Sequence, residues 1–243
     1  MRLIFSILFV AISTSSSFAS NCDSLKTALQ AKYNKKPNDA AIQLEVINTF
    51  NENNCVESEF YGKVCLAYHT SKPSHESAFW LGEFNYGIKH FSESLKYYRE
   101  ALRLAVLNKT VTQETKTYYN RQAAMSAINS NDFVSAYDFS DKVIQQNPED
   151  KFMYLIQSKS VAGAECGKND FELKLRYFLA YDLAEKAQGK NAQYDNASRK
   201  LMEYCKERFP STKELFDNGM IDKTKVRIGC HFNKAARIRT SSF

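Results

Sequence analysis

The stretch that decides the fold is HESAFWLGEFNYGIKHFSESLKYYREALR, residues 75–103, because its residue spacing recurs in TYYNRQAAMSAINSNDFVSAYDFSDKVIQQNP, residues 117–148. Counted from Gly82 in the first segment and from Ala124 in the second, the residues 9, 12, 16 and 19 positions later are Phe91, Ser94, Tyr98 and Ala101, and then Phe133, Ala136, Ser140 and Val143. This spacing is typical of two antiparallel helices, because small residues let neighbouring helices approach closely. We therefore expect helical pairs stacked in series, each dependent on its neighbours for stability.

Helical patterns continue on both sides of these two segments. The further amphipathic stretches are residues 23–33, 39–50, 57–69, 151–162, 171–187 and 192–209. Pro148 ends a helix, since the residue before a proline avoids the α region. Residues 34–38 form a break, with Asn38 or Asp39 as the N-cap of the next helix. Gly (8) and Pro (4) are scarce in 243 residues, which disfavours a turn-rich β-sandwich. The pattern predicts an all-α array of roughly nine helices.

The end of the chain changes to a period of two. Between residues 225 and 240, apolar and polar residues alternate on both sides of Asn233-Lys234. This pattern predicts a small β-hairpin whose apolar face packs on the helices, because a lone hairpin is marginal in water. Its outer face would carry Lys225, Arg227, Arg237 and Arg239. These four are either an ordinary solvated face or a surface for an acidic partner or an anionic cell-surface polymer.

The first 19 residues have the pattern of a cleavable secretion signal. Arg2 carries a positive charge, residues 3–12 are almost entirely apolar, and Ser17-Phe18-Ala19 fits the small-x-small pattern of a signal peptidase site. An apolar run of about ten residues is too short to cross a bilayer, which needs roughly 20. We expect a signal peptide at residues 1–19, a helical array at 20–217 and a basic hairpin tail at 218–243. The protein would be exported (periplasmic, cell-surface or secreted), with no membrane span after cleavage.

The net charge of +6 comes from the two ends of the chain. Residues 223–243 hold six Lys or Arg and no Asp or Glu, and Arg2 adds one charge in the leader. Residues 21–222 carry 26 basic and 27 acidic side chains, a net charge of −1. A nearly neutral body argues against nucleic-acid binding, for which Lys and Arg should cluster along the body of the fold.

Six cysteines point to disulfide bonds in an exported protein, because that compartment is oxidising. There is no CxxC or CxxH pair, so the usual local spacing of a zinc site is missing. Antiparallel helices bring each of two pairs to one end of a helical hairpin, and a third bond would tie the tail to the N-terminal helices. The expected pairings are Cys22–Cys55, Cys166–Cys205 and Cys65–Cys230. The rival Cys55–Cys65 bond would span about 12 Å of helix, beyond the Cα separation of about 7 Å that a disulfide tolerates.

The repeated segments resemble the tetratricopeptide repeat, a helix–turn–helix unit of about 34 residues. The two repeated segments lie 42 residues apart, where the family has 34. The eight additional residues map onto residues 107–114, a poor helix segment between two good ones. The family's usual aromatic residue at its fourth position is missing. The resemblance implies antiparallel helical hairpins stacked as a short solenoid, in which the first helix of each pair lines a peptide-binding groove. The groove residues that it implies are Phe79, Glu83, Tyr86, Tyr118, Arg121, Met125 and Asn129.

The same resemblance limits what this groove would bind. Carboxylate-clamp repeats, which capture a peptide C-terminus, have Lys and Asn where this chain has Phe79 and Glu83, and Arg121 and Met125. The resemblance therefore implies an apolar or mixed peptide surface.

The mature chain is also similar to exported tetratricopeptide-repeat proteins of Bacteroidota-type bacteria. In these, a helical array ends in a segment like Lys-Val-Arg-Ile-Gly-Cys-His-Phe, residues 225–232 here, followed by a second short basic strand. His231 stands where those proteins usually have Trp. The resemblance implies a scaffold that binds a protein or peptide partner outside the cytoplasm, and it carries over no catalytic residues.

The sequence contains no recognised catalytic motif. The four histidines, at positions 69, 75, 90 and 231, form no HExxH motif, and neither Gly-x-Ser-x-Gly nor a Gly-rich phosphate loop occurs. We therefore expect a non-enzymatic scaffold without a cofactor or metal. The alternatives are a module that binds a polysaccharide or another anion through its basic tail, and a secreted enzyme whose site matches no known motif.

Overall fold

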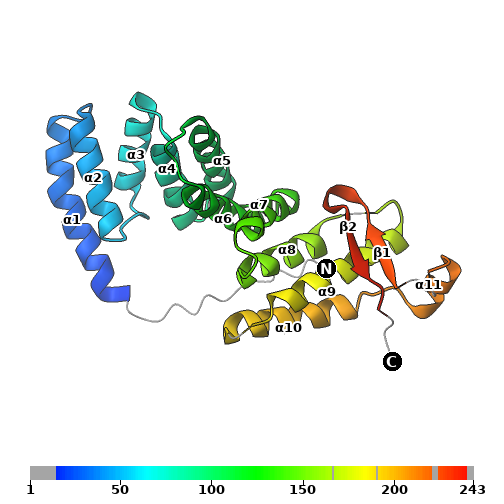
Figure 1. The fold of residues 1–243 in the computed structure, drawn as a ribbon. Helices are drawn as coiled ribbons and strands as arrows, with labels where there is room; N and C mark the ends of the chain where they lie inside the picture. The colour runs from blue at the N-terminus through cyan, green and yellow to red at the C-terminus, as the bar shows by residue number, and fades with distance from the viewer. Residues whose placement is uncertain (1–14, 166, 190, 221–223, 240–243) are drawn as a thin grey trace. The chain divides into compact units, whose positions relative to one another are not determined.

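The computed structural model describes residues 15–165, 167–189, 191–220 and 224–239, with the backbone alone for residues 15–21 and 230. The chain divides into two compact units, Met1–Pro73 and Ser74–Phe243. In both units the described residues are mainly helical, and a two-stranded hairpin lies near the C-terminus (Figure 1). The predicted fold class, helical pairs followed by a small β-hairpin, is confirmed.

The first unit is built from α1 (Ser15–Lys35), α2 (Ala40–Glu52) and α3 (Glu59–Ser71). The side chain of Asp39 accepts the backbone N–H of Ala41 at 3.0 Å, which confirms an N-cap in the predicted break. Phe50, fully buried, lies with its ring centroid 5.9 Å from those of Phe60 and Tyr61. These contacts form the core between α2 and α3.

A disulfide bond between Cys22 and Cys55 joins α1 to the loop after α2, with 5.6 Å between the two Cα atoms. This confirms the pairing expected from antiparallel helices. Because the bond closes a separation of 33 residues, it restricts the unfolded chain and stabilises the pair α1–α2.

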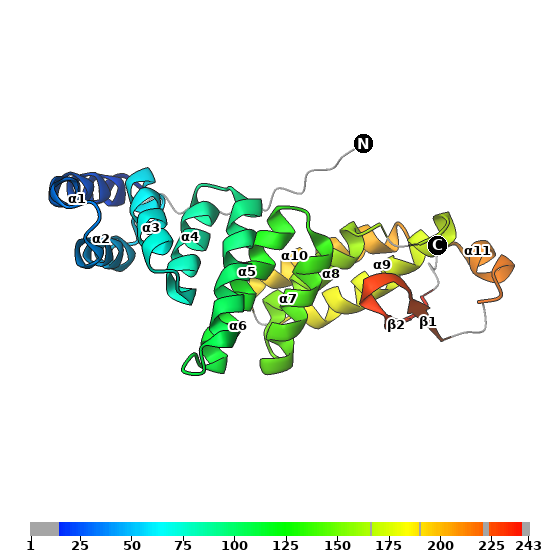
Figure 2. The ribbon, with the colours of Figure 1, turned by 90° about the horizontal axis from the view of Figure 1, so that it is seen from above.

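The second unit contains the repeated segments and the helices that follow them. Its helices are α4 (His75–Gly87), α5 (Phe91–Leu107), α6 (Gln113–Asn129), α7 (Phe133–Gln146), α8 (Lys151–Gly163), α9 (Asp170–Ala187), α10 (Ala192–Lys206) and the short α11 (Thr212–Asp217). From α5 to α10 each helix packs against the one before it, as Figures 1 and 2 show. α8 also contacts both α6 and α10, so the first helices of successive pairs lie side by side.

Small residues bring the helices of this unit close together. A Cβ atom added at Gly82 on α4 would lie 2.5 Å from Cε1 of Tyr98 on α5, so only glycine leaves room for this ring. The Ser94 hydroxyl donates to the Gly82 carbonyl at 2.8 Å and lies 2.9 Å from the hydroxyl of Ser126 on α6. The repeated spacing therefore corresponds to contacts within one pair and between one pair and the next.

The hairpin consists of β1 (Lys225–Ile228), a 3-10 turn (Cys230–Phe232) and β2 (Lys234–Arg237), paired antiparallel. Val226 lies opposite Ala236, and both are buried against α9, as expected for the apolar face. The Phe232 ring packs 4.6 Å from that of Tyr137 on α7. β1 ends earlier than the alternation predicts, because the turn follows it directly and Asn233 adopts a left-handed conformation (φ 42°) that asparagine tolerates.

The helices differ from the expected pattern at the start of α1 and in the presence of α11. α1 begins at Ser15, so residues 15–19 of the expected leader are helical, and residues 1–14 lie outside the described part of the chain. The expected break after Leu107 is present, and α6 begins at Gln113. α11 was not expected; its signal is a capping box in which Ser211 and Glu214 satisfy each other's backbone N–H groups.

Candidate functional site

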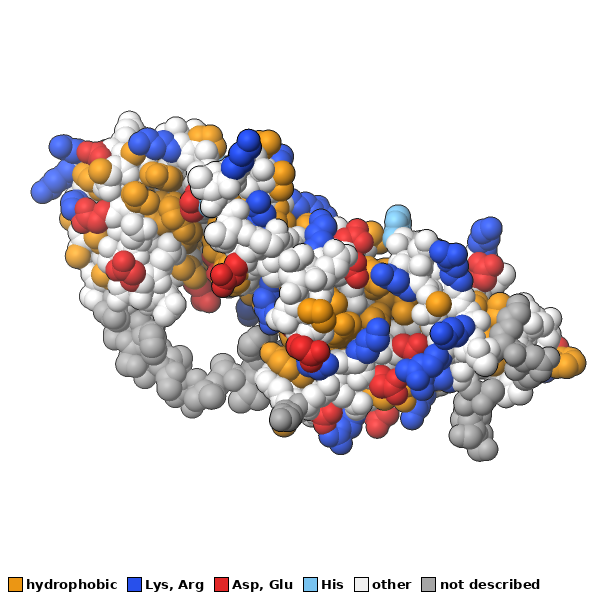
Figure 3. Space-filling model, in the orientation of Figure 1, with side chains coloured by type: hydrophobic (Ala, Val, Ile, Leu, Met, Phe, Trp, Pro, Cys, Tyr) orange, Lys and Arg blue, Asp and Glu red, His pale blue; other side chains and the backbone are white. Residues whose placement is uncertain are grey.

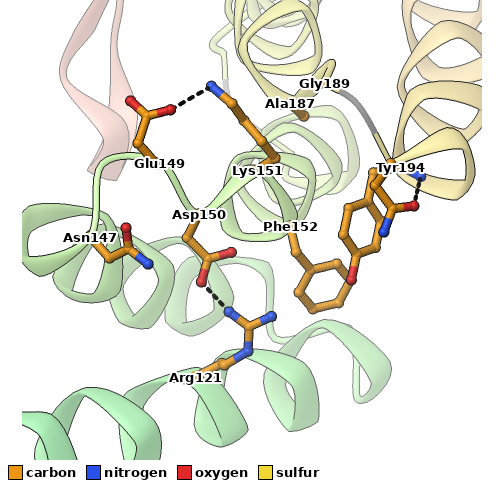
Figure 4. Close-up of a pocket in the computed structure, with 10 residues that line it drawn as sticks. Arg121, Asn147, Glu149, Asp150, Lys151, Phe152, Ala187, Gly189 and Tyr194 are labelled. Atoms are coloured by element: carbon orange, nitrogen blue, oxygen red, sulfur yellow. Dashed lines mark hydrogen bonds and ion pairs between the residues drawn. The ribbon is translucent and has the colours of Figure 1, made fainter.

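A cleft of about 320 Å³ opens between α6, the start of α8 and the start of α10 in the second unit. Its lining residues are Arg121, Asn147, Glu149, Asp150, Lys151, Phe152, Ala187, Gly189, Asn191 and Tyr194. Figure 4 shows that these side chains come from four separate segments and face a common space. Helix capping brings two of them there, since Asp150 is the N-cap of α8 and Asn191 is the N-cap of α10.

Arg121, one of the seven expected groove residues, is fixed in this cleft by two contacts. Its guanidinium donates to the carboxylate of Asp150, and it lies 5.2 Å from the centroid of the Phe152 ring (Figure 4). The side chain of Asp150 also accepts the backbone N–H of Met153 at 3.3 Å. A planar guanidinium held by a carboxylate and a ring is rigid, so Arg121 is pre-organised as part of the cleft wall.

Two aromatic rings lie beside Arg121 in the cleft. The ring of Phe152 lies 5.4 Å from the ring of Tyr194 on α10, and Figure 4 shows the two rings side by side. Both residues are partly exposed. Large, rigid and partly exposed rings are typical contact residues at binding surfaces, because they offer apolar area at little cost in conformational entropy.

A second group of aromatic residues connects α4 to α6. The Phe79 ring stacks on Tyr119 at 4.6 Å and lies 5.5 Å from the rings of both Tyr98 and Tyr118. Tyr118 is 46% exposed, so this cluster reaches the surface. Since Tyr118 lies one turn before Arg121 on α6, the cluster continues into the cleft.

Glu83 is a carboxyl group set among tyrosines on α4. It accepts a hydrogen bond from the Tyr98 hydroxyl. Burial raises the pKa of Glu83 above its usual value, and this effect outweighs the opposite effect of the hydrogen bond from Tyr98. Burial also raises the pKa of Tyr118, and the negative charge of Glu83 raises it further. The inner side of α4 therefore holds a poorly solvated acid beside an exposed phenol.

Side-chain contacts and electrostatic interactions connect six of the seven expected groove residues. Tyr86 on α4 accepts a hydrogen bond from the Asn129 side chain on α6 at 3.2 Å, which adds these two residues to the contacts of Phe79, Glu83, Tyr118 and Arg121. Met125 is half-buried and lies one turn after Arg121. The inner faces of α4 and α6 thus form one surface, which we call the inner groove, and Phe152 and Tyr194 extend it over α8 and α10.

Phe152, Tyr194 and Asp150 were missed by the sequence reasoning. The sequence indicates these residues only weakly. The repeated spacing of small and aromatic residues stops at Pro148, and the helices after it do not show this spacing. Counting helical pairs beyond Pro148 would have placed the beginnings of α8 and α10 beside the expected groove.

The four basic residues of the tail differ in their surroundings. Lys225 and Arg227 are exposed on β1, and the Arg227 Nε donates to the Asn233 side chain at 2.7 Å. The other two residues face α9. Arg239 reaches Asp182 at 2.6 Å and Glu185 at 3.1 Å, and Arg237 reaches Glu185 at 2.8 Å.

The pairing with α9 reduces the basic surface expected for the tail. Arg239 also lies 4.2 Å from the centroid of the Tyr181 ring. On the face drawn in Figure 3, basic side chains of the second unit lie among acidic ones. The hairpin therefore uses Arg237 and Arg239 to bind its own helix.

Two further cysteines, Cys65 and Cys205, are buried free thiols, and burial raises the pKa of each to about 12. Their expected partners are Cys166, which lies outside the described residues, and Cys230, whose side chain is not described. Because Cys205 and Cys65 are free thiols in the structure, it does not bear out the expected Cys166–Cys205 and Cys65–Cys230 pairings.

The described residues contain no group of three or more His, Cys, Asp or Glu side chains arranged to hold a metal ion. Within the same part of the chain, no helix is long and apolar enough to span a membrane. Comparison with protein-family models and with curated proteins finds no match to this sequence. The inner groove and its cleft are therefore the features from which we infer function.

Proposed function

We propose that the protein is an interaction scaffold that binds an extended segment of another protein in the inner groove, outside the cytoplasm. The observation that carries the proposal is a series of residues from α4 to α10. Phe79 contacts Tyr118, Arg121 follows Tyr118 by one turn on α6, and Arg121 contacts Phe152, which contacts Tyr194. This series crosses the first helices of four successive pairs, so an extended chain lying across them would meet a new ring or guanidinium at each helix.

The composition of this surface suits a peptide ligand. Aromatic residues and Arg are enriched among the residues that dominate binding energies at protein interfaces. The ion pair of Arg121 with Asp150 fixes the guanidinium before a ligand arrives, which lowers the entropy cost of binding. The disulfide Cys22–Cys55 supports a location in an oxidising compartment.

The test is affinity capture from the exported fraction with the chain from residue 20 onward, followed by mass spectrometry. The variant Phe152→Ala/Tyr194→Ala removes the two rings of the cleft, and Phe216→Ala is the matched control, because Phe216 is 68% exposed on α11, away from the groove. We expect a captured partner to lose at least about tenfold in affinity with the double variant, as interface hot spots do. A partner that binds the double variant and the wild-type chain equally would exclude the groove as its binding site.

A further inference from the structure

α8 carries a cation that the described structure leaves without a partner. Lys159 is half-buried, and no hydrogen bond or ion pair joins it to any described residue. α8 itself, with the sequence KFMYLIQSKSVAG, contains no Asp or Glu. A poorly solvated, unpaired ammonium group is costly in a folded protein, and such groups are found where a ligand or a reaction uses them.

Lys159 lies on the same face of α8 as Phe152. The two residues are seven positions apart, which is two turns and about 10.5 Å along the helix axis. Phe152 contacts Arg121 on α6 and Tyr194 on α10, so this face of α8 is the one between α6 and α10. We therefore place Lys159 in the inner groove as a second α8 residue, two turns beyond Phe152.

The helix register predicts which residues flank this amine. α6, α8 and α10 run in the same direction, since an antiparallel helix separates each from the next. Seven residues on from Arg121 and from Tyr194 are Ile128 and Leu201, so the register predicts these two as neighbours of Lys159. Both are partly buried apolar residues packed against the core. Burial lowers the pKa of Lys159 to about 8.

We propose that Lys159 binds an acidic side chain, Asp or Glu, of the extended peptide that occupies the inner groove. The inference rests on the proposed function and specifies its ligand. Charge complementarity supplies the argument, because a carboxylate would pair a cation that has no partner among the described residues and is half-buried, where such a pair is poorly screened. An extended peptide advances about 3.3 Å per residue, so the acid would lie within about three residues of the side chain that fills the Phe152–Tyr194 cleft.

The probe is a library of random dodecapeptides displayed at the N-terminus of a phage coat protein and selected on the chain from residue 20 onward. Peptides displayed in this way have no free C-terminal carboxylate, so an enriched acid must be a side chain. We expect enrichment of an aromatic or aliphatic residue with Asp or Glu within about three positions. Amidated synthetic copies of the selected peptides then serve for affinity measurements.

Peptide affinity is compared between two substitutions, one on α8 and one on α10. Lys159→Met replaces the amine with an apolar side chain of similar length, and Lys200→Met is the matched control, because Lys200 is exposed on α10. We expect Lys159→Met to weaken binding of an acidic peptide about tenfold and Lys200→Met to leave it unchanged. Exchanging the acid of the peptide for its amide should give the same loss, and combining both changes should add nothing further. Circular dichroism confirms that each variant is folded.

The outcomes separate the two proposals. If the selected peptides lose affinity on Phe152→Ala/Tyr194→Ala but contain no preferred acid, or bind Lys159→Met normally, the role of Lys159 is wrong and the groove stands. If no peptide is selected, or the selected ones ignore both sets of variants, the groove itself is wrong. If a synthetic peptide binds only when its C-terminal carboxylate is free, the acid that Lys159 recognises is not an Asp or Glu side chain, and the proposal is wrong.

Discussion

Tyr98 occupies the space that a side chain at position 82 would need, because a Cβ atom there would lie 2.5 Å from the edge of its ring. The ring is fully buried, and its hydroxyl donates to Glu83 on the same helix as Gly82. One glycine therefore decides both how closely α4 and α5 pack and how the phenol reaches the inner groove.

The first prediction concerns this contact. Gly82→Ala should lower the free energy of unfolding of the second unit by about 1–3 kcal/mol, because the methyl group must displace a ring locked in the core. The higher helix propensity of alanine, about 1 kcal/mol, offsets only part of this cost. Urea denaturation followed by circular dichroism measures the change. Gly229→Ala is the control, since no atom lies within 4 Å of a Cβ added there, and its midpoint should not move.

The second prediction concerns the disulfide of the first unit. Replacing Cys22 and Cys55 by Ser should lower the stability of this unit by about 2–4 kcal/mol, as expected for a closed loop of this length. Thermal unfolding with and without a reductant measures the loss. The reductant should lower the unfolding temperature of the wild-type chain more than that of the double variant, because the variant lacks this bond. Non-reducing peptide mapping reports in the same samples whether Cys166–Cys205 and Cys65–Cys230 form. Recovery of Cys22 as a free thiol would contradict the structure.

The third prediction concerns the attachment of the hairpin to α9. Asp182→Asn should speed amide hydrogen exchange in β1 and β2, because Asp182 accepts from both the Arg237 backbone N–H at 2.9 Å and the Arg239 guanidinium. A loss of about 1–2 kcal/mol would give roughly a five- to thirtyfold faster exchange. Lys225→Ala serves as the control, since Lys225 is exposed on β1. Equal protection in both variants would show that apolar packing alone holds the hairpin.

The fourth prediction concerns the pH dependence of stability at Glu83. Its pKa is raised in the folded protein, so the folded state disfavours the carboxylate. The resulting cost is absent below the unfolded pKa of 4.5 and fully present above the folded pKa. The stability of the wild-type chain relative to Glu83→Gln should therefore fall as the pH rises from 4 to 7. Urea midpoints of the two proteins measured in parallel give this difference, and a constant difference would mean that Glu83 is well solvated.

The fifth prediction separates the stability effect of Lys159 from its proposed role in binding. Burial lowers its pKa to about 8, so the protonated amine destabilises the fold below pH 8, and this cost disappears as the pH rises toward 10.5. Lys159→Met should therefore raise the free energy of unfolding at pH 7 by on the order of 1–3 kcal/mol. Urea denaturation at pH 7 measures it. A variant that is more stable yet binds acidic peptides less well is the signature of a residue kept for function.

Much of the helical array could be predicted from the sequence, and the reason is local. The spacing from Gly82 to Tyr98 and from Ala124 to Ser140 reports which side chains meet within a helical pair, and the break at residues 34–38 reports where a helix must begin again. The period of two in the tail predicted the hairpin, with Val226 and Ala236 on its buried face. α11 was missed because it is only six residues long and has no apolar periodicity to detect.

The sequence by itself determined the helical pairs, the hairpin and a disulfide between Cys22 and Cys55, because each depends on spacing along the chain or on which end of a helix a residue occupies. The tertiary structure alone decided which polar groups are paired. Arg237 and Arg239 are bound by carboxylates 52 to 57 residues away on α9, whereas no residue in the described part of the chain pairs with Lys159, which lies on a helix that lacks acids. Such pairings depend on contacts between distant segments, and these arise only when the helices pack.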